Sequence, residues 1–388
     1  MPLPTSITEQ NPSDNGSGSS ISDSDGSLSD DQGTPYISPQ MAATFGIGDL
    51  DSMTSYVEIL DLLSLVNADI QKQSYDSPIY PGTLRLLQDL CFHFIAIPRA
   101  FVLQHINFNR KDVIGRGGEV TAYSGRLEGH PQRVVVREVV MSPSEWASRP
   151  GRKVKRLIHR EAITHSLLHH PNILPFLGIY HEDDGSPPLT VVPLIERGSL
   201  QKVLEDGLLN PHTLQCILLG VSRGVEYLHS RRPPIVHGDI HPGNILVDFA
   251  HNPYLCDFGM SRIRHEVTRT QTILLERGRE RFMAPELFRR RTTSYRTSSA
   301  SDIFSLAMTF LNAWSGQPPF SEIRNNRKAV SALGRGQRPG VPASGVALAP
   351  GVTKHLWELL CEIPVIHNRM FRVYRSKNNH CYQSPPRP

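Results

Sequence analysis

The stretch HGDIHPGNILVDFAHNPYLCDFG runs from His237 to Gly259 and decides the fold. Within it, Asp239 precedes Asn244 by five residues, and Asp257 opens the tripeptide Asp-Phe-Gly. Apolar runs on either side of the turn AHNP predict a tight β-hairpin, which returns Asp257 to the cleft that holds Asp239. Phosphoryl transfer needs this set: one carboxylate to orient or accept a hydroxyl proton, and oxygen ligands to hold Mg²⁺ on the phosphates.

This spacing resembles the catalytic loop and metal loop of eukaryotic protein kinases, in which H-R-D-x-x-x-x-N is followed by D-F-G. Flanking motifs extend the resemblance over residues 109–375, in a style similar to the tyrosine-kinase-like group and its fungal members. The resemblance implies an α+β, bilobal fold. An antiparallel β-sheet small lobe is expected over residues 109–194, and a mainly helical large lobe over residues 195–375.

The same resemblance implies the chemistry of the site. Asp239 corresponds to the catalytic base, and Asn244 and Asp257 correspond to the magnesium ligands. ATP and Mg²⁺ are the implied cofactors, and the implied partners are the nucleotide and a protein substrate or signalling partner. Serine or threonine hydroxyls are the favoured acceptors, with tyrosine as the alternative.

Composition indicates an intracellular protein, most simply a cytoplasmic one. The five cysteines are odd in number and lack metal-ligand spacing, which argues against a disulfide framework or a zinc site. No apolar run reaches membrane-spanning length, and the first residues lack the order of a signal peptide. No Lys or Arg precedes Lys72, while that segment holds 11 acids. The basic remainder favours anionic partners such as nucleotides, but no aromatic-basic pattern predicts specific nucleic-acid binding.

Two segments precede the kinase-like part. Residues 1–40 are rich in Ser, Gly, Asp and Pro, so we expect a disordered tail that cannot bury enough apolar area to fold. Residues 41–108 read as a helical extension, with helices over Thr54–Ile70 and Thr83–Ile95. Covering the core is one role for these helices, and binding a partner is the other. Residues 376–388 form a polar tail.

The nucleotide site is expected to lie between the lobes. The turn VIGRGGEVTAYSG resembles the glycine-rich loop, but Val120 stands at its third glycine and Ala122 at its valine. Val135 takes the place of the alanine that packs on adenine. Val192 corresponds to the gatekeeper and Pro193–Ile195 to the hinge. The expected cofactor-binding residues are Ile114, Gly115, Gly117, Gly118, Ala122, Val135, Arg137, Val192, Leu194 and Leu246.

A cationic clamp is the next element of the pattern. Arg137 follows three valines where the family carries a lysine, and Arg is not equivalent to Lys at a tightly shaped site. Its expected partner is Glu161, on a helix over Lys153–Leu168. Arg137 and Glu161 therefore complete the expected catalytic set of Asp239, Asn244 and Asp257.

The large lobe keeps several further motifs. A buried helix is expected over His212–Ser230, and Asp302 corresponds to the buried acid that braces the catalytic loop. Gly238 replaces the arginine of H-R-D, and His241 stands where a lysine contacts the γ-phosphate. Near the end, Arg369 aligns with the family's late arginine, which pairs with the glutamate of A-P-E.

Two interpretations follow. The first is a protein kinase, supported by the presence of every acid and the asparagine. The second is a pseudokinase, the same fold used as a scaffold or signalling module. It is supported by five departures from the family pattern along the nucleotide and phosphate path: Val120, Val135, Arg137, His241 and Arg279.

Overall fold

The computed structural model describes residues 55–74, 77, 79–116, 120–182, 187–207, 209–232, 234–257, 279–288, 297–335 and 337–339. All of them belong to one compact unit, Pro35–Pro388, which is distinct from a second unit, Met1–Thr34. Several predicted features lie outside the described residues, namely the disordered tail, Gly117, Gly118, Arg369 and the polar tail. None of the described helices is long and apolar enough to span a membrane.

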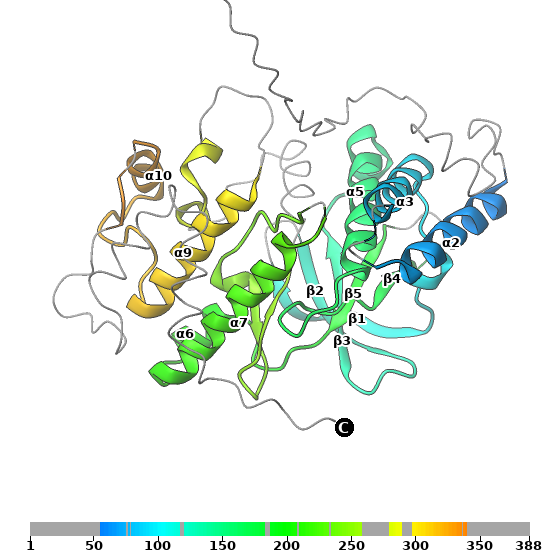
Figure 1. Cartoon of the computed structure of the whole chain (residues 1–388). Helices are drawn as coiled ribbons and strands as arrows, with labels where there is room; N and C mark the ends of the chain where they lie inside the picture. Colours follow the sequence, from blue (N-terminus) through cyan, green and yellow to red (C-terminus); the bar gives the residue numbers. More distant parts are fainter. Residues whose placement is uncertain are drawn as a thin grey trace, which may run out of the picture. The chain divides into compact units, whose positions relative to one another are not determined.

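The small lobe is built on one antiparallel sheet of five strands (Figure 1). In spatial order these are β1 (Ile106–Arg116), β2 (Val120–Leu127), β3 (Arg133–Val139), β5 (Leu189–Pro193) and β4 (Gly178–Tyr180). Because side chains alternate along a strand, Val134 and Val136 are buried on one face with Val191. Val135 and Arg137 therefore project from the opposite face, on which the pocket described below lies.

Helices of the extension pack against the longest helix of the small lobe. These are α2 (Tyr56–Lys72) and α3 (Tyr80–Phe94), and α3 lies against α5 (Arg149–Ser166), which follows the short helix α4 (Pro143–Ala147). Leu63, Leu87 and Ile163 are fully buried in one cluster that includes all three long helices. The two predicted extension helices are confirmed with ends shifted by up to three residues, and they cover the core.

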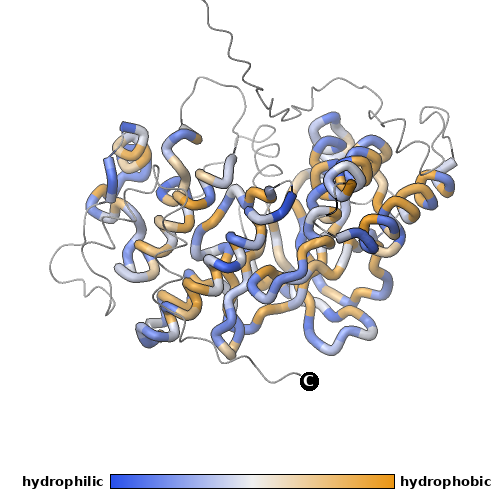
Figure 2. The backbone as a smooth tube through the Cα atoms, in the orientation of Figure 1, coloured by the Kyte–Doolittle hydropathy of each residue, from blue (hydrophilic) through white to orange (hydrophobic). Residues whose placement is uncertain are grey.

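The large lobe centres on α7 (Pro211–His229) and α9 (Ser299–Ser315), with α6 (Leu200–Glu205) and α10 (Asn326–Gly334) beside them (Figure 1). Figure 2 shows apolar stretches alternating with polar ones along α6, α7 and α10, as expected for helices with one buried side. Residues 301–315 of α9 are buried on all sides. The interior of this lobe is therefore arranged around α9.

The predicted hairpin is present as β6 (Ile245–Val247) and β7 (Pro253–Leu255). Two glycines of α7 allow this hairpin to pack closely on the helix. A Cβ atom at Gly220 would meet the Pro253 side chain at 2.5 Å, and one at Gly224 would meet the Leu255 side chain at 2.7 Å. The sequence thus places small residues where the helix and the site-bearing hairpin touch.

We expect Leu87→Ala to destabilise the protein by about 2–5 kcal/mol, because it leaves a cavity between α3 and α5. The free energy of unfolding, measured by urea titration, provides the test. Leu65→Ala is the matched control: Leu65 is 52% exposed on α2, so this change should cost less than about 0.5 kcal/mol. Equal effects of the two variants would show that the extension is not part of the core.

Candidate active site

A buried carboxylate fixes the loop that carries Asp239. Asp302, on α9, is 1% exposed and accepts three hydrogen bonds. The donors are the backbone amides of His237 and Gly238, each at 2.7 Å, and Nε2 of His229 at 2.9 Å. The contact predicted for Asp302 is therefore present. Gly238 has a φ of 77°, a conformation that glycine adopts without steric cost.

Asp239 and Asn244 are joined directly. Nδ2 of Asn244 donates to the Asp239 carbonyl oxygen at 2.8 Å and to Oδ2 of its carboxylate at 2.9 Å. The backbone amide of Cys256 donates to the Asn244 carbonyl oxygen at 3.0 Å, which extends the pairing of β6 with β7 by one step. Asp257, the next residue, is thereby held beside the Asp239–Asn244 pair, as the hairpin predicts.

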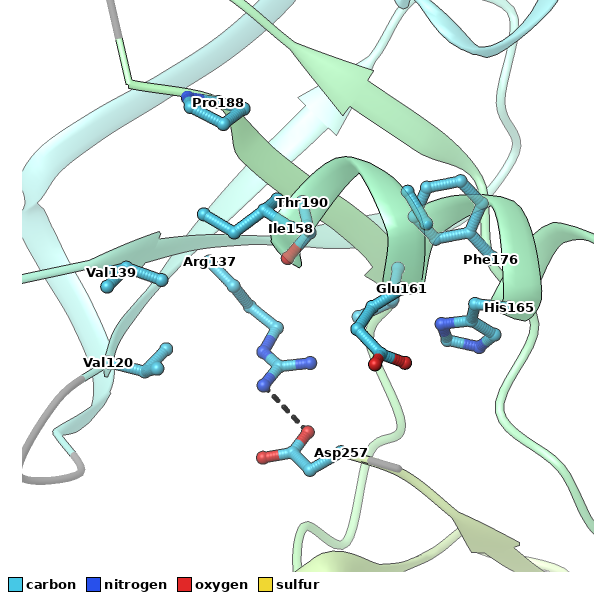
Figure 3. A pocket seen from close by; sticks show the side chains of 12 residues that line it. Val120, Arg137, Val139, Ile158, Glu161, His165, Phe176, Pro188, Thr190 and Asp257 are labelled. Carbon is cyan, nitrogen blue, oxygen red and sulfur yellow. Dashed lines mark ion pairs between the residues drawn. The ribbon is translucent and has the colours of Figure 1, made fainter. Parts of the chain in front are cut away.

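Arg137 and Asp257 meet in a pocket between the sheet and α5 (Figure 3). Nη2 of Arg137 lies 2.7 Å from Oδ1 of Asp257, and the two side chains are 13% and 16% exposed. Glu161 and His165 line the same pocket from α5, and Val192 lines it from β5. The structure thus brings together Arg137, Glu161 and Asp257, and the ion pair drawn for Arg137 is with Asp257.

An apolar cluster adjoins this pocket through Val192. Val192 is buried with Leu174 and Cys256, and the half-buried Val135 and Leu246 pack against them. Val135 and Val192 are paired across β3 and β5, while Leu246 lies on β6 of the large lobe. Three of the expected cofactor-binding residues, Val135, Val192 and Leu246, are therefore neighbours, although they come from distant parts of the chain.

The other expected cofactor-binding residues are spread along the sheet. Ala122 pairs with Arg137 across β2 and β3, and Gly115 pairs with Ala122 across β1 and β2. Ile114 is 49% exposed. The Leu194 amide donates to the Arg133 carbonyl at 3.0 Å, so this N–H already has a backbone acceptor.

The carboxylate of Asp239 has two further cationic or polar neighbours. Nε of Arg279 lies 3.5 Å from Oδ1, and Nε2 of His241 lies 3.9 Å from Oδ2. Burial lowers the pKa of His241 to about 3, and the nearby positive charge of Arg279 acts in the same direction. His241 is therefore neutral at pH 7, and Arg279 provides the positive charge next to Asp239.

Two polar side chains that have no role in the sequence prediction make hydrogen bonds inside the protein. Arg281 is 5% exposed, and its guanidinium donates to Oδ1 of Asn326 and to backbone carbonyls that include Pro319. His165 donates from Nε2 to the Leu174 carbonyl at 2.7 Å. For Arg281 the available signal is its place beside the A-P-E motif, and for His165 it is its place one helical turn after Glu161.

Oxygen atoms suited to a hard cation are present at the site. Because Nδ2 of Asn244 donates to Asp239, its amide oxygen is the atom left for a cation, and Asp257 adds a carboxylate. Among the described residues, no group of three or more His, Cys, Asp or Glu side chains is arranged to hold a metal. The donor set therefore fits a hard divalent cation, which Asn244 and Asp257 would hold, with Arg137 competing for Asp257.

The sheet, the helical lobe and the loop between them define a bilobal domain of the protein kinase type. Residues 108–338 match the family described as protein kinase domain, which is more than half of the chain. The chain belongs to this family, which uses ATP and a divalent metal. The match begins one residue before the predicted start of the domain, and the extension to residue 375 stays a prediction.

The relatives are named as kinases, several of them as serine/threonine-protein kinases. The chain is 34% identical to a probable LRR receptor-like serine/threonine-protein kinase of Arabidopsis thaliana, over 58% of this chain and 23% of the relative. It is 33% identical to rust resistance kinase Lr10 of Triticum aestivum, over 53% of this chain and 32% of the relative. It is 31% identical to the Pelle-like serine/threonine-protein kinase pik-1 of Caenorhabditis elegans, over 58% of this chain and 47% of the relative. The chain thus spans less than half the length of these relatives.

Acid should destabilise the fold through three buried histidines. Burial lowers the pKa of His159 and His241 to about 3, and that of His165 to about 4. The unfolded chain, with histidine pKa values near 6.5, therefore binds more protons, so stability falls as pH drops below about 6.5 toward 4. Each histidine should cost about 1.4 kcal/mol between pH 7.5 and pH 5.5.

His159→Leu isolates one of these contributions. Urea unfolding at pH 7.5 and pH 5.5 should show that the variant loses about 1.4 kcal/mol less than the parent protein on acidification. An identical loss in both proteins would mean that His159 is not held neutral by burial.

Proposed function

We propose that this domain transfers the γ-phosphoryl group of ATP to serine or threonine hydroxyls of other proteins. The observation that carries the proposal is the joint placement of Asp239, Asn244 and Asp257 by one hydrogen-bonded loop and hairpin. Membership of the family and the serine/threonine kinases among the relatives support it. The cysteine pattern supports a cytoplasmic place of action.

In the proposed reaction, the acceptor oxygen forms a bond to the γ-phosphorus while the bond to the bridging oxygen of ADP breaks. The proton of the acceptor hydroxyl passes to the carboxylate of Asp239, which the Asn244 amide holds in place. Asn244 and Asp257 would hold Mg²⁺. The chemistry that Mg²⁺ supplies when bound is neutralisation of charge on the phosphates.

The nucleotide base would bind at the apolar cluster. Val135 and Val192 would contact one side of the adenine from the sheet, and Leu246 would contact the other side from the large lobe. Arg137 would contact the phosphates, with its position set by the pocket that it shares with Glu161. To do so it must exchange at least part of its pairing with Asp257 for the phosphate oxygens, because both compete for the same guanidinium.

A second candidate is a domain that binds nucleotide or partners without transferring phosphate. Two ion pairs favour this second candidate: Arg137 is paired with Asp257, and Arg279 is paired with Asp239. Each guanidinium stands beside an oxygen that the transfer reaction needs. If neither pair opens, the fold remains a signalling module, and the acids serve to hold the two lobes and the loop.

Transfer and binding are separated by one pair of measurements. We expect ATP with Mg²⁺ to raise the melting temperature of the full chain, and ³²P to pass from γ-labelled ATP to a generic serine/threonine substrate. Asp239→Asn should keep the thermal shift and lower transfer at least ~10²-fold, because it removes the proton acceptor. A shift without transfer in the parent protein supports the second candidate. If ATP with Mg²⁺ does not raise the melting temperature, both nucleotide binding and phosphoryl transfer are contradicted.

Arg279→Ser tests the role of the cation beside Asp239. Serine or threonine is the family's residue here, and its smaller side chain frees the carboxylate for an incoming hydroxyl. If Arg279 obstructs the acceptor, transfer should rise about tenfold or more, with the KM for ATP unchanged. If it stabilises the γ-phosphate in place of a lysine at His241, transfer should fall by ~10²-fold. Unchanged transfer would assign Arg279 to neither role.

A further inference from the structure

Helix α5 is rich in basic residues in its N-terminal half. Before Glu161, its first 12 residues contain six bases and no acid: Arg149, Arg152, Lys153, Lys155, Arg156 and Arg160. At about 100° per residue, Arg149, Arg152 and Arg156 share one face of the helix. The apolar face of α5 is already buried in the core through Val154 and Ile158. The basic face is therefore left beside α3, outside that core.

The guanidinium groups on this face lack acidic partners among the described residues. Arg152 donates from Nη1 to the Ala147 carbonyl at 3.2 Å, which holds it over the start of α5. The Arg156 guanidinium lies 5.2 Å from the Phe92 ring centroid of α3, and its Nε is buried without a hydrogen-bond acceptor in the part of the chain described. Burial, together with the charge of Arg152, lowers the pKa of Arg156. A buried N–H group without an acceptor destabilises the protein, so a bound acceptor at Arg156 would be stabilising.

A second polar side chain on this helix is also unmet. His159, three residues after Arg156, is 4% exposed, and neither of its ring nitrogens has a hydrogen-bond partner among the described residues. The start of α5 contributes only the positive end of the helix dipole, because Ser148 caps the N–H of Gly151 and the carbonyl oxygens of Glu145 and Trp146 lie against Gly151. Forked guanidinium donors on one helix face are a device with which proteins bind phosphate.

We propose that the N-terminal half of α5, beside α3, binds a phosphorylated serine or threonine in a segment of another protein. Arg149, Arg152 and Arg156 would supply forked donors that match phosphate oxygens. They span roughly 10 Å along the helix, the size of one phosphoryl group and its flanking acids. This site is separate from the nucleotide pocket and does not depend on phosphoryl transfer.

The geometry favours a phosphopeptide over a membrane surface. Membrane-binding helices pair a basic face with apolar side chains that enter the lipid. In α5 the apolar side chains Val154, Leu157 and Ile158 are buried within the protein. The guanidinium of Arg156 is moreover recessed against Phe92, where a narrow phosphate reaches it more readily than a flat bilayer does.

Fluorescence anisotropy of the full chain with a labelled peptide tests this site. The probe is a 15-residue peptide with one phosphoserine flanked by aspartates. We expect saturable binding, at least tenfold weaker for the serine form of the peptide and at least tenfold weaker for the double variant Arg149→Glu/Arg152→Glu. The matched control Arg327→Glu/Lys328→Glu makes the same charge change at exposed residues of α10 and should stay within about twofold.

Folding and specificity are checked in the same series. Melting temperatures of both double variants should match that of the parent protein, because the substituted side chains are exposed. Arg156→Lys keeps the charge but removes the fork, and should weaken phosphopeptide binding several-fold. Equal binding of the serine and phosphoserine peptides overturns the proposal. So does an equal loss in the α10 control, or Arg152-dependent binding to vesicles containing a phosphoinositide without binding to the peptide.

Discussion

The carboxylate of Asp302 is the contact on which the site depends. The loop from His237 to Asn244 has little regular structure, so side-chain hydrogen bonds must set its path. Asp302 receives two backbone amides from that loop and an imidazole from α7, inside the core of the large lobe. Charge-assisted bonds of this kind are short and strong when buried. The packing of α9 therefore determines where Asp239 lies. The hairpin then places Asp257 next to Asp239.

Two arginines set the electrostatic state of the site. Arg137 forms an ion pair with Asp257, and Arg279 forms one with Asp239, so each acid has a cation beside it. At His241 the family's positive charge is lost, because burial keeps that imidazole neutral, and Arg279 places a charge nearby from a different segment. The balance between catalysis and scaffolding depends on how readily these guanidinium groups leave the carboxylates for phosphate oxygens.

Sequence reasoning predicted the elements better than the contacts between them. The hairpin, the extension helices and the brace at Asp302 follow from spacing and local pattern. The start of α5 lies at Arg149, four residues before the predicted Lys153, because Pro150 and Gly151 fit the first turn of a capped helix. The sequence predicted Glu161 as the partner of Arg137, whereas the ion pair in the structure is with Asp257. Asp257 lies 120 residues further along the chain, so this pairing depends on the tertiary structure. The five carbonyl and amide acceptors around Arg281 are likewise invisible in the sequence.

We propose that one scaffold gathers Asp239, Asn244 and Asp257 around a metal-bound nucleotide. A crystal structure of the full chain with a non-hydrolysable ATP analogue and Mn²⁺, in which anomalous scattering locates the metal, provides the decisive measurement. We expect a manganese peak bound by the Asn244 amide oxygen and the Asp257 carboxylate, with Arg137 displaced toward the phosphates. A nucleotide-saturated crystal without that peak, with Arg137 still paired to Asp257, would contradict it.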